Sequence, residues 1–202
     1  MQLLIATTNA GKIKEYRHLL REVPLLLVTL SDLGIEEKPE ETGVTLEENA
    51  LLKAQFYFEK SGISVLADDT GLEIDAVGGE PGIHARRWPG YEATDQELID
   101  YALKRLEGVP KEKRTARFRA VIAIAKDKQD IRLFDGIMEG YIAEKAYYPI
   151  VAGYPYRSLF SLTLGGKVLS EFAIEELEDM HRKRAIEKAL PFLFEIQESG
   201  VE

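Results

Sequence analysis

A short polar turn near the amino terminus has the composition of a phosphate-binding site. It follows an apolar stretch at residues 2–6 and precedes a stretch with helical spacing, so it lies between a strand and a helix. Backbone N–H groups at a helix start carry partial positive charge, and a lysine adds a full charge. The turn consists of Thr7, Thr8, Asn9, Ala10, Gly11 and Lys12. An equally good interpretation of so short a pattern is a tight turn in which Asn9 caps the helix.

Two adjacent aspartates, Asp68 and Asp69, follow an apolar strand expected at residues 64–67. Neighbouring carboxylates repel each other unless a proton or a cation relieves the repulsion, and Mg²⁺ fits that need. Glu40 and Glu41, in an acidic loop, are expected to complete this oxygen-ligand metal site. The alternatives are an Asx-turn at the aspartates and an acidic loop that is merely solvated.

Two further segments carry cationic side chains. The loop at residues 78–90 is rich in glycine, and its Arg87, beside Trp88, is suited to pair with a phosphate or stack on a base. His181 and Arg182 begin a basic run between two expected helices. Positive charge at a helix start is unfavourable unless an anion lies nearby, and a solvated helix start is the alternative interpretation.

Composition excludes several classes of function. The chain has 202 residues, no cysteine and a net charge of −9. Thiol catalysis, disulfides and thiolate metal sites are therefore ruled out, and a nucleic-acid polymer is a poor partner for so acidic a protein. The first apolar run is too short for a signal peptide or a membrane span, so we expect a soluble, cytoplasmic protein with no membrane partner.

Strands and helices must position these segments. Hydrophobic spacing predicts strands at residues 2–6, 25–30, 64–67, 115–125 and 131–143, the last two forming a hairpin. It predicts one helix after residue 11 and others at residues 45–60, 94–106, 170–178 and 182–197. The second and third helices begin with capping boxes at Thr45 and Thr94. An irregular loop is expected at residues 146–158. We therefore predict a mixed α/β fold, residues 1–202 forming one domain with two lobes.

The motifs together resemble the inosine triphosphate pyrophosphatase family. The likeness is co-linear from the first residue to about residue 190. The first block is LIATTNAGK at residues 4–12, followed by Glu15. The next is ETG at residues 41–43 with ENA at residues 48–50 and Lys53. The most specific block is ADDTGL at residues 67–72, which continues through the glycines of the loop at residues 78–90.

This resemblance implies an elongated mixed sheet with flanking helices, a central cleft between the lobes and a homodimer. It also implies Mg²⁺-dependent cleavage of ITP, dITP or XTP to the monophosphate and pyrophosphate. By the same likeness, Asp69 is the general base and a metal ligand, and Glu40 or Glu41 assists with the metal. Lys53 neutralises phosphate charge, and the turn at residues 7–12 holds phosphates. Thr70 and Arg87 are further candidates for substrate binding.

The base-recognition segments depart from the family's pattern. The family has Phe-Gly-Tyr-Asp-Pro where this chain has Ala152-Gly153-Tyr154-Pro155-Tyr156, and Leu177 replaces a lysine. The remaining candidates for base binding are Gly153, Tyr154, His181 and Arg182. Losing a buried hydrogen-bond partner changes selectivity strongly. Two alternatives therefore stay open: a pyrophosphatase for a different or modified nucleotide, and a nucleotide-binding protein that has lost turnover.

Overall fold

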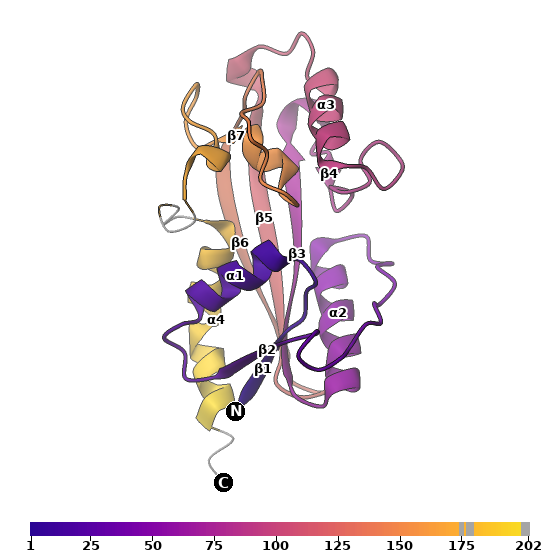
Figure 1. The fold of residues 1–202 in the computed structure, drawn as a ribbon, viewed down its shortest axis with the longest axis vertical. Helices are drawn as coiled ribbons and strands as arrows, with labels where there is room; N and C mark the ends of the chain where they lie inside the picture. The colour runs from indigo at the N-terminus through magenta and orange to yellow at the C-terminus, as the bar shows by residue number, and fades with distance from the viewer. Residues whose placement is uncertain (174–175, 177–179, 199–202) are drawn as a thin grey trace. The chain divides into compact units, whose positions relative to one another are not determined.

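The computed structural model describes residues 1–173, 176 and 180–198 (Figure 1). The chain forms two compact units. The first contains Met1–Asp69, Ala120–Gly136 and the residues from His181 onward, and the second contains Thr70–Arg119 and Ile137–Met180. Strands β3 (Ser64–Ile74), β5 (Thr115–Ala125) and β6 (Ile131–Ile142) each contribute residues to both units. The predicted mixed α/β class is confirmed.

The first unit contains a mostly buried sheet with the strand order β2-β1-β3-β5-β6. Its central strand β1 (Gln2–Ile5) pairs in parallel with β2 (Leu26–Thr29) and with β3, so that Leu4 lies beside Val28 and Val65. Parallel strands of this kind read as continuous apolar runs because both of their faces are covered. That explains why residues 2–6 and 64–67 are so apolar.

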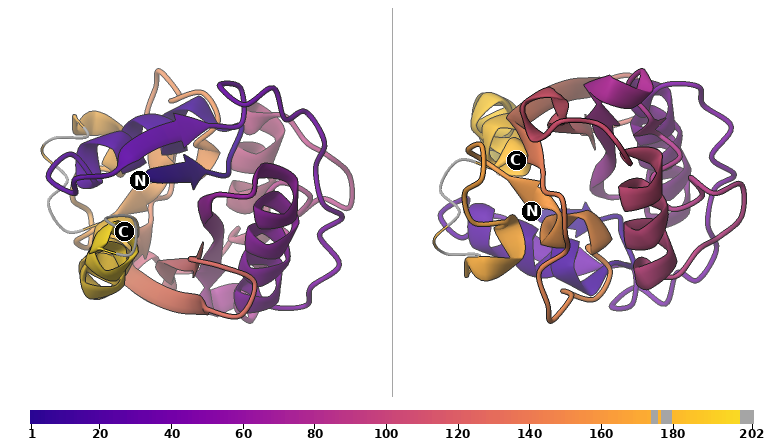
Figure 2. Two further views of the ribbon diagram at one scale, coloured as in Figure 1. Left: turned by 90° about the horizontal axis from the view of Figure 1, so that it is seen from below. Right: turned by 90° about the horizontal axis from the view of Figure 1, so that it is seen from above.

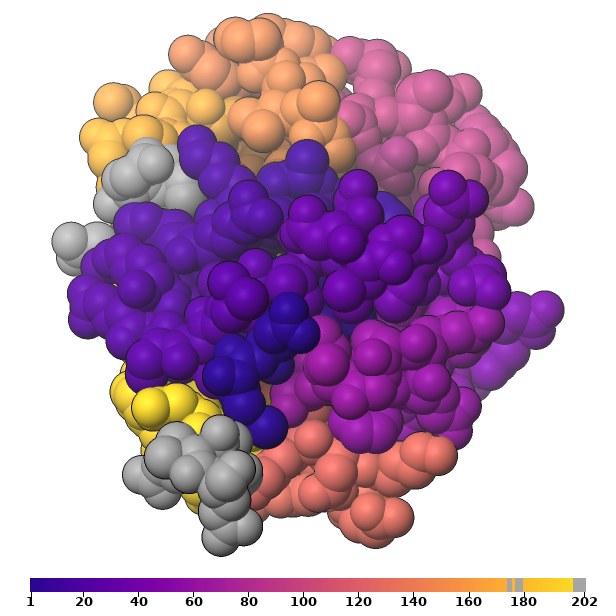
Figure 3. Space-filling model, turned by 60° about the horizontal axis from the view of Figure 1, so that its bottom comes forward, coloured from indigo at the N-terminus to yellow at the C-terminus, as the bar shows by residue number. Residues whose placement is uncertain are grey.

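Helices cover both faces of this sheet. Helices α1 (Ala10–Leu19) and α4 (His181–Glu198) share one core with the strands, and its largest buried side chains are Tyr16, Leu3, Ile5, Leu66 and Phe192. Helix α2 (Leu46–Ser61) covers the other face (Figures 1 and 2). The connection from β2 to α2 is largely exposed and lies at the surface with α2 beside it (Figure 3).

The second unit has its own core. Parts of β3, β5 and β6 are joined there by β4 (Pro81–Gly82) and β7 (Phe160–Ser161), and α3 (Asp95–Arg105) packs through Leu98 and Ile99. Short 3₁₀ turns occupy Asp75–Val77, Lys111–Lys113, Pro155–Ser158 and Leu169–Glu171. No helix in the described part of the chain is long and apolar enough to cross a bilayer.

Two predictions about these elements need correction. The strand expected at residues 64–67 does not end at Asp68 but continues to Ile74, because Leu72 and Ile74 are buried in the core of the second unit. The aspartates therefore belong to a strand, and the Asx-turn alternative is wrong. The helix expected at residues 170–178 is not continuous: the 3₁₀ turn Leu169–Glu171 ends in the extended Phe172, and Glu176 belongs to a further 3₁₀ turn, while residues 174, 175 and 177–179 lie outside the described part.

A glycine in β6 allows α4 to begin against the sheet of the first unit. A Cβ atom at Gly136 would lie 1.9 Å from the carbonyl oxygen of His181 and 2.8 Å from the amide nitrogen of Ala185. Both atoms belong to helix backbone, which cannot rotate away as a side chain can. The first turn of α4 can therefore pack against β6 only because the residue at position 136 has no side chain.

We predict that Gly136→Ala destabilises the protein by about 2 kcal/mol or more, because overpacking against backbone requires the helix to shift. Urea unfolding would measure the change. Gly62→Ala is the matched control, since Gly62 caps α2 with φ +66 and has open space around it. An effect at Gly136 no larger than the one at Gly62 would contradict the role assigned to the close approach.

Candidate active site

The turn after β1 is organised by the cap of helix α1. Asn9 Oδ1 accepts hydrogen bonds from the backbone N–H groups of Gly11, at 2.9 Å, and Lys12, at 3.2 Å. Thr7 Oγ1 in turn accepts from the N–H of Asn9. The structure therefore confirms that Asn9 caps helix α1. Thr8 and Ala10 are exposed, so the turn still presents part of its surface to solvent at the carboxyl end of β1.

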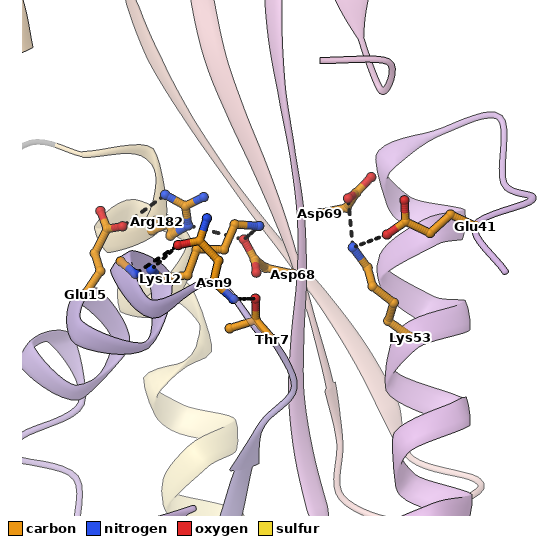
Figure 4. A network of polar contacts seen from close by, with 10 residues as sticks. Thr7, Asn9, Lys12, Glu15, Glu41, Lys53, Asp68, Asp69 and Arg182 are labelled. Carbon is orange, nitrogen blue, oxygen red and sulfur yellow. Dashed lines mark hydrogen bonds and ion pairs between the residues drawn. The ribbon is translucent and has the colours of Figure 1, made fainter. Parts of the chain in front are cut away.

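Asp68 is the centre of a buried charge cluster at this turn. Its Oδ2 atom lies 2.9 Å from Lys12 Nζ and 3.2 Å from Arg182 Nε, and its side chain is 1% exposed (Figure 4). Arg182 Nη1 also contacts Glu15 Oε2 at 3.1 Å. The buried Arg182 and the partly buried Lys12 are thereby matched by two buried carboxylates, which is the arrangement that buried charges require. The cluster connects α1, β3 and α4.

The positive charges around Asp68 favour the ionised form of its carboxylate. Burial alone would raise the pKa of Asp68, but the charges of Lys12, Arg182 and Lys53 hold it well below its usual range. Burial lowers the pKa of Lys12, and the charges of Arg182 and Lys53 add to the effect while Asp68 opposes it. Burial and the charge of Asp68 raise the pKa of the Tyr16 hydroxyl well above its usual range.

A second group forms on the opposite face of β3. Lys53 of α2 places its Nζ atom 2.8 Å from Asp69 Oδ1 and 3.4 Å from Glu41 Oε1 (Figure 4). Burial alone would lower the pKa of Lys53, but the charges of Asp69, Asp68 and Glu41 outweigh burial and raise it. Two carboxylates from separate segments thus converge on one ammonium group.

The two groups lie close together although β3 runs between them. Successive side chains of a strand point to opposite faces, so Asp68 faces α1 and α4 whereas Asp69 faces α2 (Figure 4). The Ala6 N–H donates a hydrogen bond of 2.8 Å to the Leu66 carbonyl, so the end of β1 lies beside β3. Because Asp68 and Asp69 are consecutive residues of β3, only the strand backbone separates the two groups, and the charge of Lys53 contributes to the lowered pKa of Lys12.

The predicted metal ligands are only partly brought together. Glu41 and Asp69 meet at Lys53, whereas Asp68 faces the other side of the strand and is bonded to Lys12 and Arg182. Glu40 is exposed. A site formed jointly by adjacent Asp68 and Asp69 is therefore not the arrangement found. In the described part of the chain, no group of three carboxylate or imidazole side chains is placed to hold a metal ion.

The pair Glu41 and Asp69 nevertheless fits a cation that also binds substrate. The ammonium group of Lys53 already contacts both carboxylates, so their oxygens converge on one positive charge. Mg²⁺ usually takes one or two protein carboxylates and completes its shell with water and substrate phosphates. A pair of protein ligands is sufficient for a metal of this kind.

The candidates for base recognition lie in different surroundings. Arg182 and His181 are buried in the first unit, and the guanidinium of Arg182 bonds to Asp68 and Glu15. In the second unit, the Gly153 N–H donates to Asp95 at 2.7 Å, and the Tyr154 ring lies 4.2 Å from the guanidinium carbon of Arg157. Their contacts with a base stay predictions.

The other predicted substrate contacts also belong to the second unit. Thr70 directly follows Asp69 in β3 and is half-buried, and Arg87 is exposed on the loop at residues 78–90. That loop is tied down by contacts from Trp88 Nε1 to Glu80 at 2.8 Å and from Tyr156 Oη to the Ala85 carbonyl at 2.7 Å. The second of these contacts joins the loop to the turn Pro155–Ser158 of the same unit.

Glu15 is the site residue that the sequence reasoning missed. In the sequence it stands only as part of the first motif block and not as a candidate site residue, yet the structure buries it beside Arg182. The available signal was spacing, because Glu15 precedes Leu19 by four residues and so shares its helix face. Asn49 of α2 was likewise not among the predicted site residues and is buried.

Comparisons with known proteins agree on one family. The sequence pattern of the Ham1 family matches residues 3–192. The chain is 39% identical to a dITP/XTP pyrophosphatase of Caldanaerobacter subterraneus subsp. tengcongensis, covering 96% of each chain. It is 37% identical to a dITP/XTP pyrophosphatase of Bacillus subtilis, covering 93% of this chain and 94% of that one. A HAM1 protein from Coxiella burnetii has a similar structure, with TM-score 0.84 and 30% identity over 96% of this chain and 99% of that chain.

We predict that Asp68→Asn lowers the free energy of unfolding by about 3–5 kcal/mol at pH 7, because it leaves the buried Arg182 and the partly buried Lys12 without their shared carboxylate. Asp69→Asn is the matched control, and its loss should be clearly smaller, since Asp69 is more exposed and Lys53 retains Glu41. Urea unfolding measures both variants. Equal losses in the two variants would contradict the assignment.

The same experiment has a pH dependence with a defined sign. Because the pKa of Asp68 is lowered in the folded state, its contribution is complete above the ordinary carboxyl pKa of about 4 and is lost as pH falls through the lower folded value. The difference in stability between wild type and Asp68→Asn should therefore stay constant at neutral pH, begin to shrink as pH falls below about 4, and continue to shrink as pH falls further.

Proposed function

Because this chain belongs to the Ham1 family, we propose that it hydrolyses ITP, dITP and XTP to the monophosphate and pyrophosphate. The family that the sequence motifs predict is confirmed. The observation that carries the proposal is the pair of lysines on the two faces of β3, each with its own aspartate, beside the turn that follows β1. Ligands of open α/β sheets bind at such carboxyl ends of strands.

A triphosphate requires local positive charge, which an acidic protein must concentrate at its site. Lys12 and Lys53 supply two cations with little exposed surface, at 18% and 12% side-chain exposure. Low exposure strengthens their attraction for phosphate oxygens because water screens them less. We assign phosphate binding to these two lysines, with the side chains of Thr7 and Thr8 and the amide of Ala10 at the turn.

Glu41 and Asp69 would hold a magnesium ion together with phosphate oxygens. The ion, when bound, supplies charge neutralisation for the phosphates and the leaving pyrophosphate. Lys53 then no longer has to balance both carboxylates, and its ammonium group becomes available to the phosphate chain. Asp68, which the sequence predicts as a metal ligand, would instead hold Lys12 and Arg182 in place and would not bind the metal.

Asp69 would act as the general base. It accepts a proton from a water molecule as the water oxygen forms a bond to phosphorus, the anhydride P–O bond breaks, and pyrophosphate leaves with the bonding electrons. Asp69 lies on the opposite face of β3 from Asp68. The general base is therefore paired with Lys53 and not with Lys12 or Arg182, the cations of the buried cluster.

Base selectivity distinguishes two candidate functions. A pyrophosphatase for another or modified nucleotide is the second candidate, because Pro155 replaces a family aspartate and is buried. A nucleotide panel with pyrophosphate detection separates these candidates. Binding without turnover would show as a nucleotide-dependent rise in melting temperature with no pyrophosphate released. The homodimer and the cytoplasmic location also stay predictions.

We predict that the wild-type protein releases pyrophosphate from dITP or XTP when Mg²⁺ is added, and that Asp69→Asn lowers kcat at least about 10³-fold, since the variant loses both the base and a metal ligand. Enzyme-coupled pyrophosphate detection measures both. Thermal unfolding provides the control, because the variant should remain folded. Retention of wild-type turnover in Asp69→Asn would remove this residue from its role.

The two neighbouring glutamates provide a matched pair for the metal site. Glu41→Gln should raise the Mg²⁺ concentration needed for half-maximal turnover about tenfold or more, because it removes a charged ligand. Glu40→Gln should leave this requirement unchanged, since the exposed Glu40 does not share the contact of Glu41 with Lys53. A reversed ranking, measured by Mg²⁺ titration of the initial rate, would assign the metal to Glu40.

A further inference from the structure

The acidic loop that carries Glu41 runs antiparallel to helix α2. Glu37 contacts Lys60 at 2.8 Å, Glu41 contacts Lys53 at 3.4 Å, and the Gly43 N–H donates to Asn49 Oδ1 at 2.9 Å. Residue numbers rise along the loop as they fall along the helix, so successive contacts lie along one face of α2. Loop carboxylates repel one another, so the loop needs such contacts to adopt one conformation.

These contacts differ in how much they can fix the loop. Glu37 and Lys60 are 62% and 42% exposed, and exposed ion pairs contribute little. Asn49 is 3% exposed, so its hydrogen bond to Gly43 is shielded from water. The contact is also sterically tight, because a Cβ atom at Gly43 would lie 2.6 Å from Asn49 Oδ1 and 2.8 Å from Glu48 Cβ.

Asn49 is one helical turn away from Lys53 on the same face of α2. The residue that holds the loop backbone and the residue that contacts Glu41 therefore belong to one rigid element. Gly43 is two residues from Glu41, which leaves little chain between the held backbone and the carboxylate. A shift at Gly43 would move Glu41 away from the oxygen atoms of Asp69.

We propose that Asn49 is a positioning residue for the metal site: its buried amide holds the loop backbone at Gly43 so that Glu41 and Asp69 converge. The inference rests on the proposed function only for the use of the metal. It concerns cation affinity and not the chemical step. Residues that orient a metal ligand typically change metal affinity 10–100-fold when they are removed.

The test measures Mn²⁺ binding to nucleotide-free protein by electron paramagnetic resonance of the free ion. Asn49→Ala should raise the Mn²⁺ dissociation constant about tenfold. Gly43→Ala should do the same from the other side of the contact, because its Cβ atom displaces Asn49 Oδ1. Hydrogen exchange at the amides of residues 40–44 should become faster in both variants.

A control at the same helix end separates positioning from general destabilisation. Thr45→Ala removes the cap of α2, in which Thr45 Oγ1 accepts from the Glu48 N–H at 3.1 Å. This variant should lose stability but keep the wild-type Mn²⁺ dissociation constant. In a Glu41→Gln background, Asn49→Ala should cause no further loss of Mn²⁺ affinity, because the ligand it positions is already gone.

Four results would overturn the inference: an unchanged dissociation constant in Asn49→Ala, an equal rise in Thr45→Ala, additive effects with Glu41→Gln, or no measurable Mn²⁺ binding to the wild type. Turnover of dITP by the wild type is measured in parallel. Absence of turnover with normal Mn²⁺ behaviour would reject the proposed function and leave Asn49 in its role. Normal turnover together with any of the four results would reject the role of Asn49 and leave the proposed function in place.

Discussion

The alternation of side chains along β3 governs the chemistry of the first unit. One residue step directs Asp68 towards α1 and α4 and Asp69 towards α2, so two adjacent carboxylates serve different purposes. The buried one neutralises Lys12 and Arg182, and the more exposed one meets Lys53 and Glu41. If β3 had ended before these residues, both aspartates would lie in a flexible turn, and neither face would be defined.

Much of this arrangement could be predicted from the sequence, since apolar runs and caps are local signals. The strand before Thr7, the capping residues Thr45 and Thr94 and the long hairpin all follow from patterns within a few residues. The family also followed from ordered motifs. The continuation of β3 was missed because Asp68 and Asp69 interrupt the apolar run, whereas the strand continues because Leu72 and Ile74 beyond them are buried in the core of the second unit.

The candidate site was harder to predict than the fold for the same reason. Glu15 and Arg182 are far apart in sequence, and nothing local indicates that a helical glutamate is buried against an arginine near the carboxyl terminus. The sequence also does not distinguish Glu40 from Glu41 as the expected partner of Asp69. Only the position of Lys53 beside Glu41 distinguishes them, because adjacent loop residues have the same composition and charge.

The paired course of the acidic loop and α2 also limits how this chain can change in length. The buried hydrogen bond at Gly43 holds the loop two residues after Glu41, so deleting or inserting one residue between Glu41 and Gly43 would bring a different side chain opposite Lys53. A change in length before Glu41 would leave this spacing unaltered. Variation in length among relatives should therefore be concentrated before Glu41 and rare between Glu41 and Gly43.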